Sequence, residues 1–145
     1  LLGLVFLRFS AKQNQSPQIL PKKITKEISP QKVSDKNINL YVSNQSFEIT
    51  PVDIVVKIDD QKIVDSIFHV DDQHNWYKYS LDLKPGVHKI EAFSKKGIAS
   101  LTKNFNVIYK HWISIDFWYY PETHYSPTPR KFSFLITDKR YPNMY

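Results

Sequence analysis

The feature that most constrains the fold of this chain is a run of strand-like alternation, interrupted by turns, between Leu81 and Val107. Pro85 and Gly86 have the composition of a type II turn, because proline presets φ at the first central position and glycine accepts a positive φ at the next. Residues 88–93 then alternate with a period of two, which is typical of a half-buried strand. The stretch predicts an antiparallel pair of strands inside an all-β domain.

The same stretch carries a recognisable pattern: Leu, then Gly-x-His, alternating aliphatic residues, a glycine-containing turn and a final Phe-x-Val. The positions that fit it are Leu83, Gly86, His88, Ile90, Ala92, Gly97, Phe105 and Val107. This pattern resembles the closing hairpin of bacterial immunoglobulin-like surface domains. The resemblance implies an immunoglobulin-like antiparallel β-sandwich. Many such domains have Asp and Gly-Asn in the second turn, in association with calcium, whereas residues 94–98 read SKKGI, so calcium binding is not carried over.

Further strand patterns fill most of the chain beyond Asn37. Residues 38–42 alternate, residues 52–58 give the clearest core strand, and residues 62–70 form a strand whose buried face is ambiguous. Six or seven short strands at spacings of about ten residues are typical of a β-sandwich. No segment combines helical periodicity with helix caps. We therefore predict one β-sandwich domain over residues 38–145.

The C-terminal part exceeds a minimal sandwich. Residues 112–120, WISIDFWYY, alternate along their length, residues 121–130 form a proline-rich polar loop, and residues 131–137 return as a second strand. The pattern predicts an additional C-terminal β-hairpin. It either adds strands to the edge of the sandwich or covers one of its sheets.

One face of this hairpin is the candidate ligand-binding surface. It would present Trp112, Asp116, Trp118 and Tyr120, with Tyr125 in the adjoining loop. Aromatic rings with polar tips supply large, rigid contact area for sugars or partner proteins. The alternative is that both faces of the strand are buried, one in the sandwich and one under the loop, and we favour this alternative. Asp116 keeps the binding interpretation open, because a buried carboxylate needs a partner.

The N-terminal part has a different composition. Residues 1–9 are mostly apolar and are interpreted as the end of a membrane anchor or signal segment, or alternatively as an ordinary strand. Residues 10–37 are rich in proline and lysine and predict a disordered basic linker. Of the formal charge of +6, the first 37 residues hold +5, and the remainder, with 13 basic and 12 acidic residues, holds +1. A nearly neutral folded part argues against nucleic-acid binding.

Residues that could carry catalysis or hold a metal give weak signals. There is no cysteine, no glycine-rich phosphate loop and no nucleophile motif. His69, Asp71, Asp72 and His74 form a compact group, but their spacing matches no zinc pattern. His88 is interpreted as a structural histidine bonded to a loop carbonyl. We predict no enzyme activity, no metal and no cofactor.

The sequence thus favours a non-catalytic binding or interaction module of the bacterial cell envelope, exported or tethered to the membrane. Its expected partner is a protein or glycan, bound through the aromatic hairpin. Two alternatives stay open. The chain could be a structural subunit of an envelope assembly that pairs by strand addition, or an accessory domain of a hydrolase.

Overall fold

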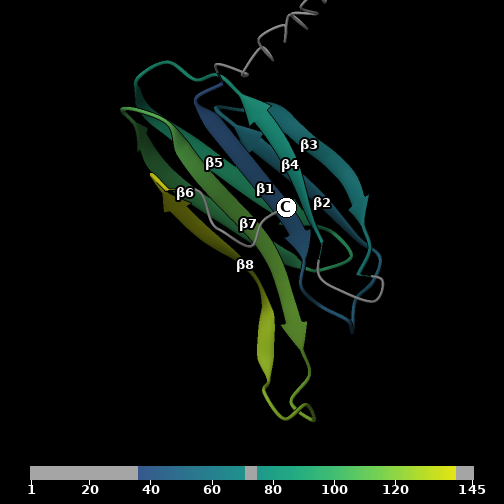
Figure 1. Cartoon of the computed structure of the whole chain (residues 1–145). Helices are drawn as coiled ribbons and strands as arrows, with labels where there is room; N and C mark the ends of the chain where they lie inside the picture. The colour runs from purple at the N-terminus through teal and green to yellow at the C-terminus, as the bar shows by residue number, and fades with distance from the viewer. Residues whose placement is uncertain (1–35, 71–74, 140–145) are drawn as a thin grey trace, which may run out of the picture. The chain divides into compact units, whose positions relative to one another are not determined.

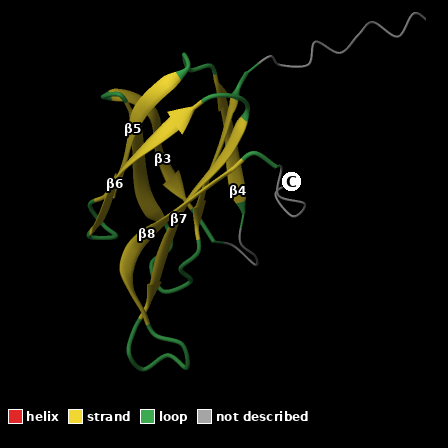
Figure 2. Cartoon of the chain, turned by 90° about the vertical axis from the view of Figure 1, so that its left-hand side faces the viewer, coloured by secondary structure: helices red, strands yellow, loops and turns green. Residues whose placement is uncertain are grey.

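The computed structural model describes residues 36–70 and 75–139, and these contain strands and no helix (Figures 1 and 2). Eight strands follow one another: β1 (Ile38–Asn44), β2 (Val52–Ile58), β3 (Gln61–Phe68), β4 (Trp76–Leu81), β5 (Gly86–Ser94), β6 (Ala99–Val107), β7 (His111–Tyr120) and β8 (Thr128–Thr137). The expected anchor, nearly all of the expected linker, and residues 71, 72 and 74 of the histidine–aspartate group lie outside the described residues. Within the described ranges, no helix long and apolar enough to cross a membrane is found.

The strands form two four-stranded sheets, in the orders β4-β1-β7-β8 and β3-β2-β5-β6. The first sheet lies over the second, as Figures 1 and 2 show from two sides. An apolar face on each sheet requires burial, and stacking two sheets is one of the few ways to achieve it. The predicted all-β sandwich is confirmed.

The expectation of a purely antiparallel sandwich is wrong at one pair. β1 pairs with β7 in parallel, with Ile38 opposite His111 and Asn44 opposite Phe117. β1 also pairs with β4, antiparallel, so β1 and β7 occupy the two central positions of their sheet. The C-terminal hairpin therefore adds strands to the sandwich edge, with β8 as the new edge strand.

The core lies between the inner faces of the two sheets. Strict alternation along β2 and β7 supplies inward aliphatic and aromatic side chains, as their sequence patterns predict. The largest fully buried side chains are Phe68, Phe117, Ile38, Leu40, Ile54, Ile58, Ile90, Ile113, Ile115, Val42, Val52 and Val56. β3 contributes Val64 and Phe68, which settles which face of that strand is buried.

The β7–β8 hairpin is longer than the strands beside it, and its end projects beyond the body of the sandwich (Figure 1). β8 begins at Thr128, so the connecting loop spans residues 121–127 and is shorter than the predicted 121–130. The prediction included residues 128–130 in the loop because Pro129 is unfavourable inside a strand. An edge strand tolerates proline, because one row of its N–H groups has no strand partner.

The two turn glycines of the β5–β6 region are required for different reasons. Gly86 has a φ of +136°, as the Pro-Gly turn predicts. Gly97 is required for space, because an added Cβ would lie 2.6 Å from Cε2 of Phe117. The positive φ in that turn falls on Ile98 instead, with φ at +49°.

Replacing Gly97 with alanine should destabilise the domain. Its Cβ would meet the buried Phe117 ring and Ser94 Oγ, which lies 2.8 Å from the Cβ position. Overpacking of this kind costs about 1–3 kcal/mol, and we expect urea denaturation to show a loss in that range. In a Phe117→Leu background the loss should be clearly smaller. Equal losses in both backgrounds would contradict a clash with the ring.

The β2–β3 turn is bonded to β5 through His88, whose structural role was predicted. Its ring contacts Asp59 Oδ2 through Nδ1 at 2.5 Å and the Lys84 carbonyl oxygen through Nε2 at 2.8 Å. Asp59 also accepts from the backbone N–H of Lys89 at 2.9 Å. Both ring nitrogens face acceptors, so the protonated imidazolium makes both bonds.

These contacts shift two pKa values. The pKa of His88 is raised from 6.5, first by its hydrogen bond to Asp59 and then by its bond to the Lys84 carbonyl. The pKa of Asp59 is lowered from 3.8, first by the Lys89 N–H and then by His88. Between pH 3.8 and pH 6.5, His88 is therefore protonated and Asp59 is ionised, so the two side chains form an ion pair.

Stability should depend on pH accordingly. The contribution of His88 is fully present below pH 6.5 and is lost as the pH rises through its raised pKa. The contribution of Asp59 is present above pH 3.8 and is lost as the pH falls through its lowered pKa. Urea denaturation across pH 4–9 should show the difference between wild type and His88→Asn shrinking from pH 6.5 upward. A difference that grows with pH would refute this assignment.

Candidate functional site

A groove at the projecting end of the β7–β8 hairpin is the candidate functional site. We call it the hairpin groove. It has a volume of about 450 Å³ and is lined by Phe47, Glu48, Trp118, Tyr120, His124, Tyr125, Ser126 and Thr128. Three of the five predicted ligand-binding residues, Trp118, Tyr120 and Tyr125, therefore lie together.

The walls of the groove are held by hydrogen bonds between β7 and the chain that follows β1. The Tyr120 hydroxyl donates to the Gln45 carbonyl oxygen at 2.9 Å. The Ser46 hydroxyl donates to the Tyr119 carbonyl oxygen at 2.8 Å, and the Gln45 N–H donates to the Phe117 carbonyl oxygen at 2.8 Å. These bonds bring the β1–β2 connection beside the hairpin and place Phe47 and Glu48 on the groove.

The loop contributes a column of rings. Tyr120 stacks on His124 with ring centroids 4.4 Å apart, and His124 contacts Tyr125 at 4.3 Å. Tyr125 is 95% exposed, so a large apolar ring stands in solvent at the end of the column. In the strands on either side of the loop, the Arg130 guanidinium of β8 lies 4.4 Å from the centre of the Tyr119 ring of β7.

Asp116, a fourth predicted site residue, is buried in the outer face of its sheet and is 8% exposed. Its Oδ1 accepts from Ser43 Oγ at 2.6 Å and from the indole Nε1 of Trp76 at 2.9 Å. Its Oδ2 accepts from Ser114 Oγ at 2.8 Å and from Ser133 Oγ at 3.3 Å. The buried carboxylate is thus paired with neutral hydrogen-bond donors from four strands. It is not exposed to a ligand in the groove.

The Asp116 cluster nevertheless reaches the groove. Trp118 donates from its indole Nε1 to Ser133 Oγ at 3.0 Å. Ser133 lies opposite Asp116 in the β7–β8 register and also bonds its carboxylate. Asp116 therefore supports one wall of the hairpin groove from behind.

Trp112, the fifth predicted residue, lies near the other end of β7. It lies six positions before Trp118 along the strand, a distance of about 20 Å. Its ring lies near the Lys110 ammonium, 5.7 Å from the ring centre. Between the two tryptophans, Ser114 and Asp116 are buried. The outer face of β7 is therefore not one continuous aromatic platform.

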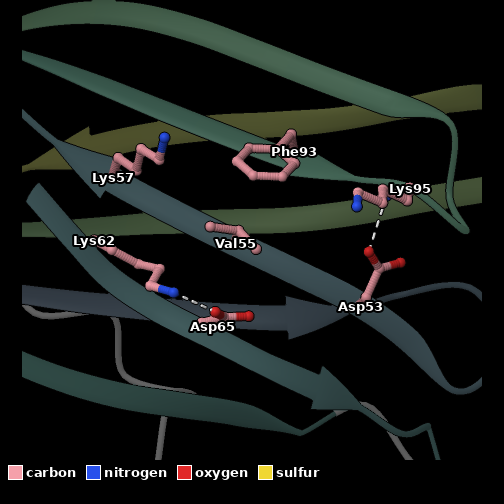
Figure 3. Close-up of a pocket in the computed structure, with 7 residues that line it drawn as sticks. All are labelled: Asp53, Val55, Lys57, Lys62, Asp65, Phe93 and Lys95. Carbon is pink, nitrogen blue, oxygen red and sulfur yellow. Dashed lines mark hydrogen bonds and ion pairs between the residues drawn. The ribbon is translucent and has the colours of Figure 1, made fainter. Parts of the chain in front are cut away.

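A second groove, of about 500 Å³, lies on the outer face of β2, β3 and β5 (Figure 3). Asp53, Val55, Lys57, Lys62, Asp65, Phe93 and Lys95 line it. Its two carboxylates are engaged: Asp65 by the Lys62 ammonium at 2.6 Å, and Asp53 by the Lys95 N–H at 2.9 Å. The Lys57 ammonium lies 5.8 Å from the Phe93 ring centre.

Sequence reasoning missed Phe47, Glu48 and His124 at the hairpin groove. Phe47 and Glu48 are about 70 residues away from Trp118 along the chain, and only the β1–β7 pairing brings them near. His124 carried a usable signal, because it stands next to Tyr125 in a short loop. Comparisons with protein-family profiles, curated proteins and solved structures give no match, so the site is interpreted from its own geometry.

Removing the Asp116 carboxylate should destabilise the protein. Asp116→Ala leaves buried hydroxyls and the Trp76 indole without their acceptor. Each hydrogen bond to a charged group contributes about 1.5–3 kcal/mol, so we expect urea denaturation to show a loss of about 3 kcal/mol. Asp116→Asn should lose less, because the amide oxygen still accepts. The exposed Asp82→Asn change is the control, and a loss below about 1 kcal/mol for Asp116→Ala would contradict the assigned role.

Proposed function

We propose that this domain is a non-catalytic carbohydrate-binding module and that the hairpin groove holds the sugar. The observation that supports the proposal most strongly is the grouping of Phe47, Trp118, Tyr120 and Tyr125 around one open groove. Aromatic rings offer flat apolar faces against which the C–H faces of a sugar ring can pack. An open groove on a projecting hairpin also leaves room for a chain of sugars.

Polar groups complete the groove. Glu48, His124, Ser126 and Thr128 line it beside the rings. A carboxylate and two hydroxyls can accept or donate hydrogen bonds to sugar hydroxyls, and such groups give orientation to a mostly apolar site. The combination of several rings with one carboxylate favours a neutral sugar over an anionic one.

The strand order supports an immunoglobulin-like assignment. The order β3-β2-β5-β6 corresponds to the C′-C-F-G sheet of variable-type immunoglobulin domains, and β4-β1 to their neighbouring strands E and B. The place beside strand B, which strand A fills in those domains, is taken here by β7, parallel to β1. In this proposal the domain is an immunoglobulin-like sandwich whose first strand is replaced by its own C-terminal hairpin.

We place the module at the bacterial cell envelope, where glycans are abundant. The basic, proline-rich residues 10–37 and the apolar residues 1–9 support a tether to a membrane. The nearly neutral folded part fits an uncharged ligand better than nucleic acid. An accessory role beside a hydrolase uses the same groove and needs no catalytic group in this domain.

Trp118→Ala should weaken glycan binding about thirtyfold while the domain stays folded. Loss of a central aromatic ring typically costs about 2 kcal/mol, or roughly thirtyfold in affinity. Isothermal titration with neutral N-acetylglucosamine oligosaccharides measures this. Circular dichroism and urea denaturation check that the variant folds.

Trp112→Ala is the matched control, because it removes the same ring from the distant end of β7. Its affinity should equal that of the wild type. Equal losses in both variants, or no loss in either, would contradict binding in the hairpin groove.

Strand addition is a second candidate function, favoured by one observation. β6 has nine residues and no proline, whereas the edge strands β3 and β4 have eight and six residues, and the edge strand β8 contains Pro129. An edge of this length is a template for a strand from another chain. Under this function, binding of the partner protein is insensitive to Trp118→Ala.

A further inference from the structure

A third groove lies at the end of the sandwich where β6 and β8 finish and β7 begins. It has a volume of about 500 Å³ and is separate from the hairpin groove. Asn104, Phe105, Asn106, Ile108, Tyr109, His111, Phe134, Ile136, Thr137 and Asp138 line it. Two of these apolar side chains are well exposed, Ile108 at 68% and Tyr109 at 55%.

His111 is the unusual residue of this groove. Its side chain is 8% exposed, and neither ring nitrogen has a hydrogen-bond partner among the described residues. Its backbone N–H donates to the Asn37 carbonyl oxygen at 2.8 Å, so the ring does not serve as the acceptor for that N–H. Buried polar groups are nearly always paired, and an unpaired imidazole in a groove indicates a missing ligand group.

The chemistry of the lining indicates which group is missing. Asp138 is the one acidic residue that lines the groove, and no lysine or arginine from the described part of the chain lines it. The β7–β8 ladder ends with Trp112 opposite Thr137, so His111 and Asp138 are the next residues along the two segments and both line the groove. Rings from Phe105, Tyr109 and Phe134 complete the lining. A carboxylate, an imidazole lone pair and aromatic faces all attract a cation that donates hydrogen bonds.

We propose that this groove binds a primary alkylammonium group between Asp138 and His111. The ammonium donates to the carboxylate and to the unprotonated ring nitrogen, and the alkyl chain lies against Ile108 and Phe134. Tyr109 must move for the ligand to reach His111, because its ring covers the imidazole with centroids 4.8 Å apart. Its high exposure leaves it room to do so. The group can come from a free amine or from the lysine side chain of a peptide.

Titrations of the ¹⁵N-labelled protein with three probes of equal chain length test the proposal. The probes are pentylammonium chloride, 1-pentanol and sodium pentanoate, at matched ionic strength. We expect pentylammonium to shift the amide signals of residues 104–111 and 134–138, with at least tenfold weaker binding of pentanol. Pentanoate should cause no shift. Nα-acetyl-lysine amide in a fourth titration distinguishes the sources: tighter binding than pentylammonium indicates a peptide, and weaker binding a free amine.

Two variants locate the site. Asp138→Asn changes an exposed residue and should weaken pentylammonium binding about tenfold. His111→Phe keeps a ring but removes both nitrogens and should weaken it as well. Asp82→Asn is the control carboxylate and should change nothing. Equal binding of pentanol and pentylammonium, or unchanged binding by Asp138→Asn, would overturn the proposal, and neither result bears on sugar binding in the hairpin groove.

Discussion

The parallel pairing of β1 with β7 is the interaction on which the rest of the structure depends. It joins strands that are about 70 residues apart in the sequence and makes both of them central in their sheet. It also extends past β1, where the Gln45 N–H donates to the Phe117 carbonyl oxygen. Without β7, the inward side chains of β1 would lose a neighbour and one edge of β1 would be unpaired. The C-terminal hairpin is therefore part of the core.

Local sequence patterns predicted the strands well. They did not predict how strands far apart in the sequence pair with one another. Alternation along β7 predicted that Ile113, Ile115 and Phe117 share one face, and all three are buried. The direction of the β1–β7 pair leaves no local trace, because either direction preserves the same alternation of faces. The need for glycine at position 97 was visible as a turn signal, but its cause is contact with the distant Phe117 ring.

The candidate site was predictable to the same extent. Alternation placed Trp112, Asp116 and Trp118 on one face, and that assignment holds in the register of the sheet. Sharing a face does not fix exposure, however, and Asp116 is enclosed by hydroxyls and an indole from its neighbours. The grouping of Trp118, Tyr120 and Tyr125 follows from nearness in sequence. The contribution of the β1–β2 connection follows only from the tertiary fold.

The central claim is that Trp118 faces a ligand in the hairpin groove. Iodide quenching of tryptophan fluorescence tests it most directly, with wild type and Trp118→Phe compared with and without N-acetylglucosamine oligosaccharide fragments. The account predicts a quenchable component that belongs to Trp118, is absent from the variant, and is protected by the glycan. Identical quenching of the two proteins, unchanged by any fragment, would contradict it and would turn attention to the β6 edge.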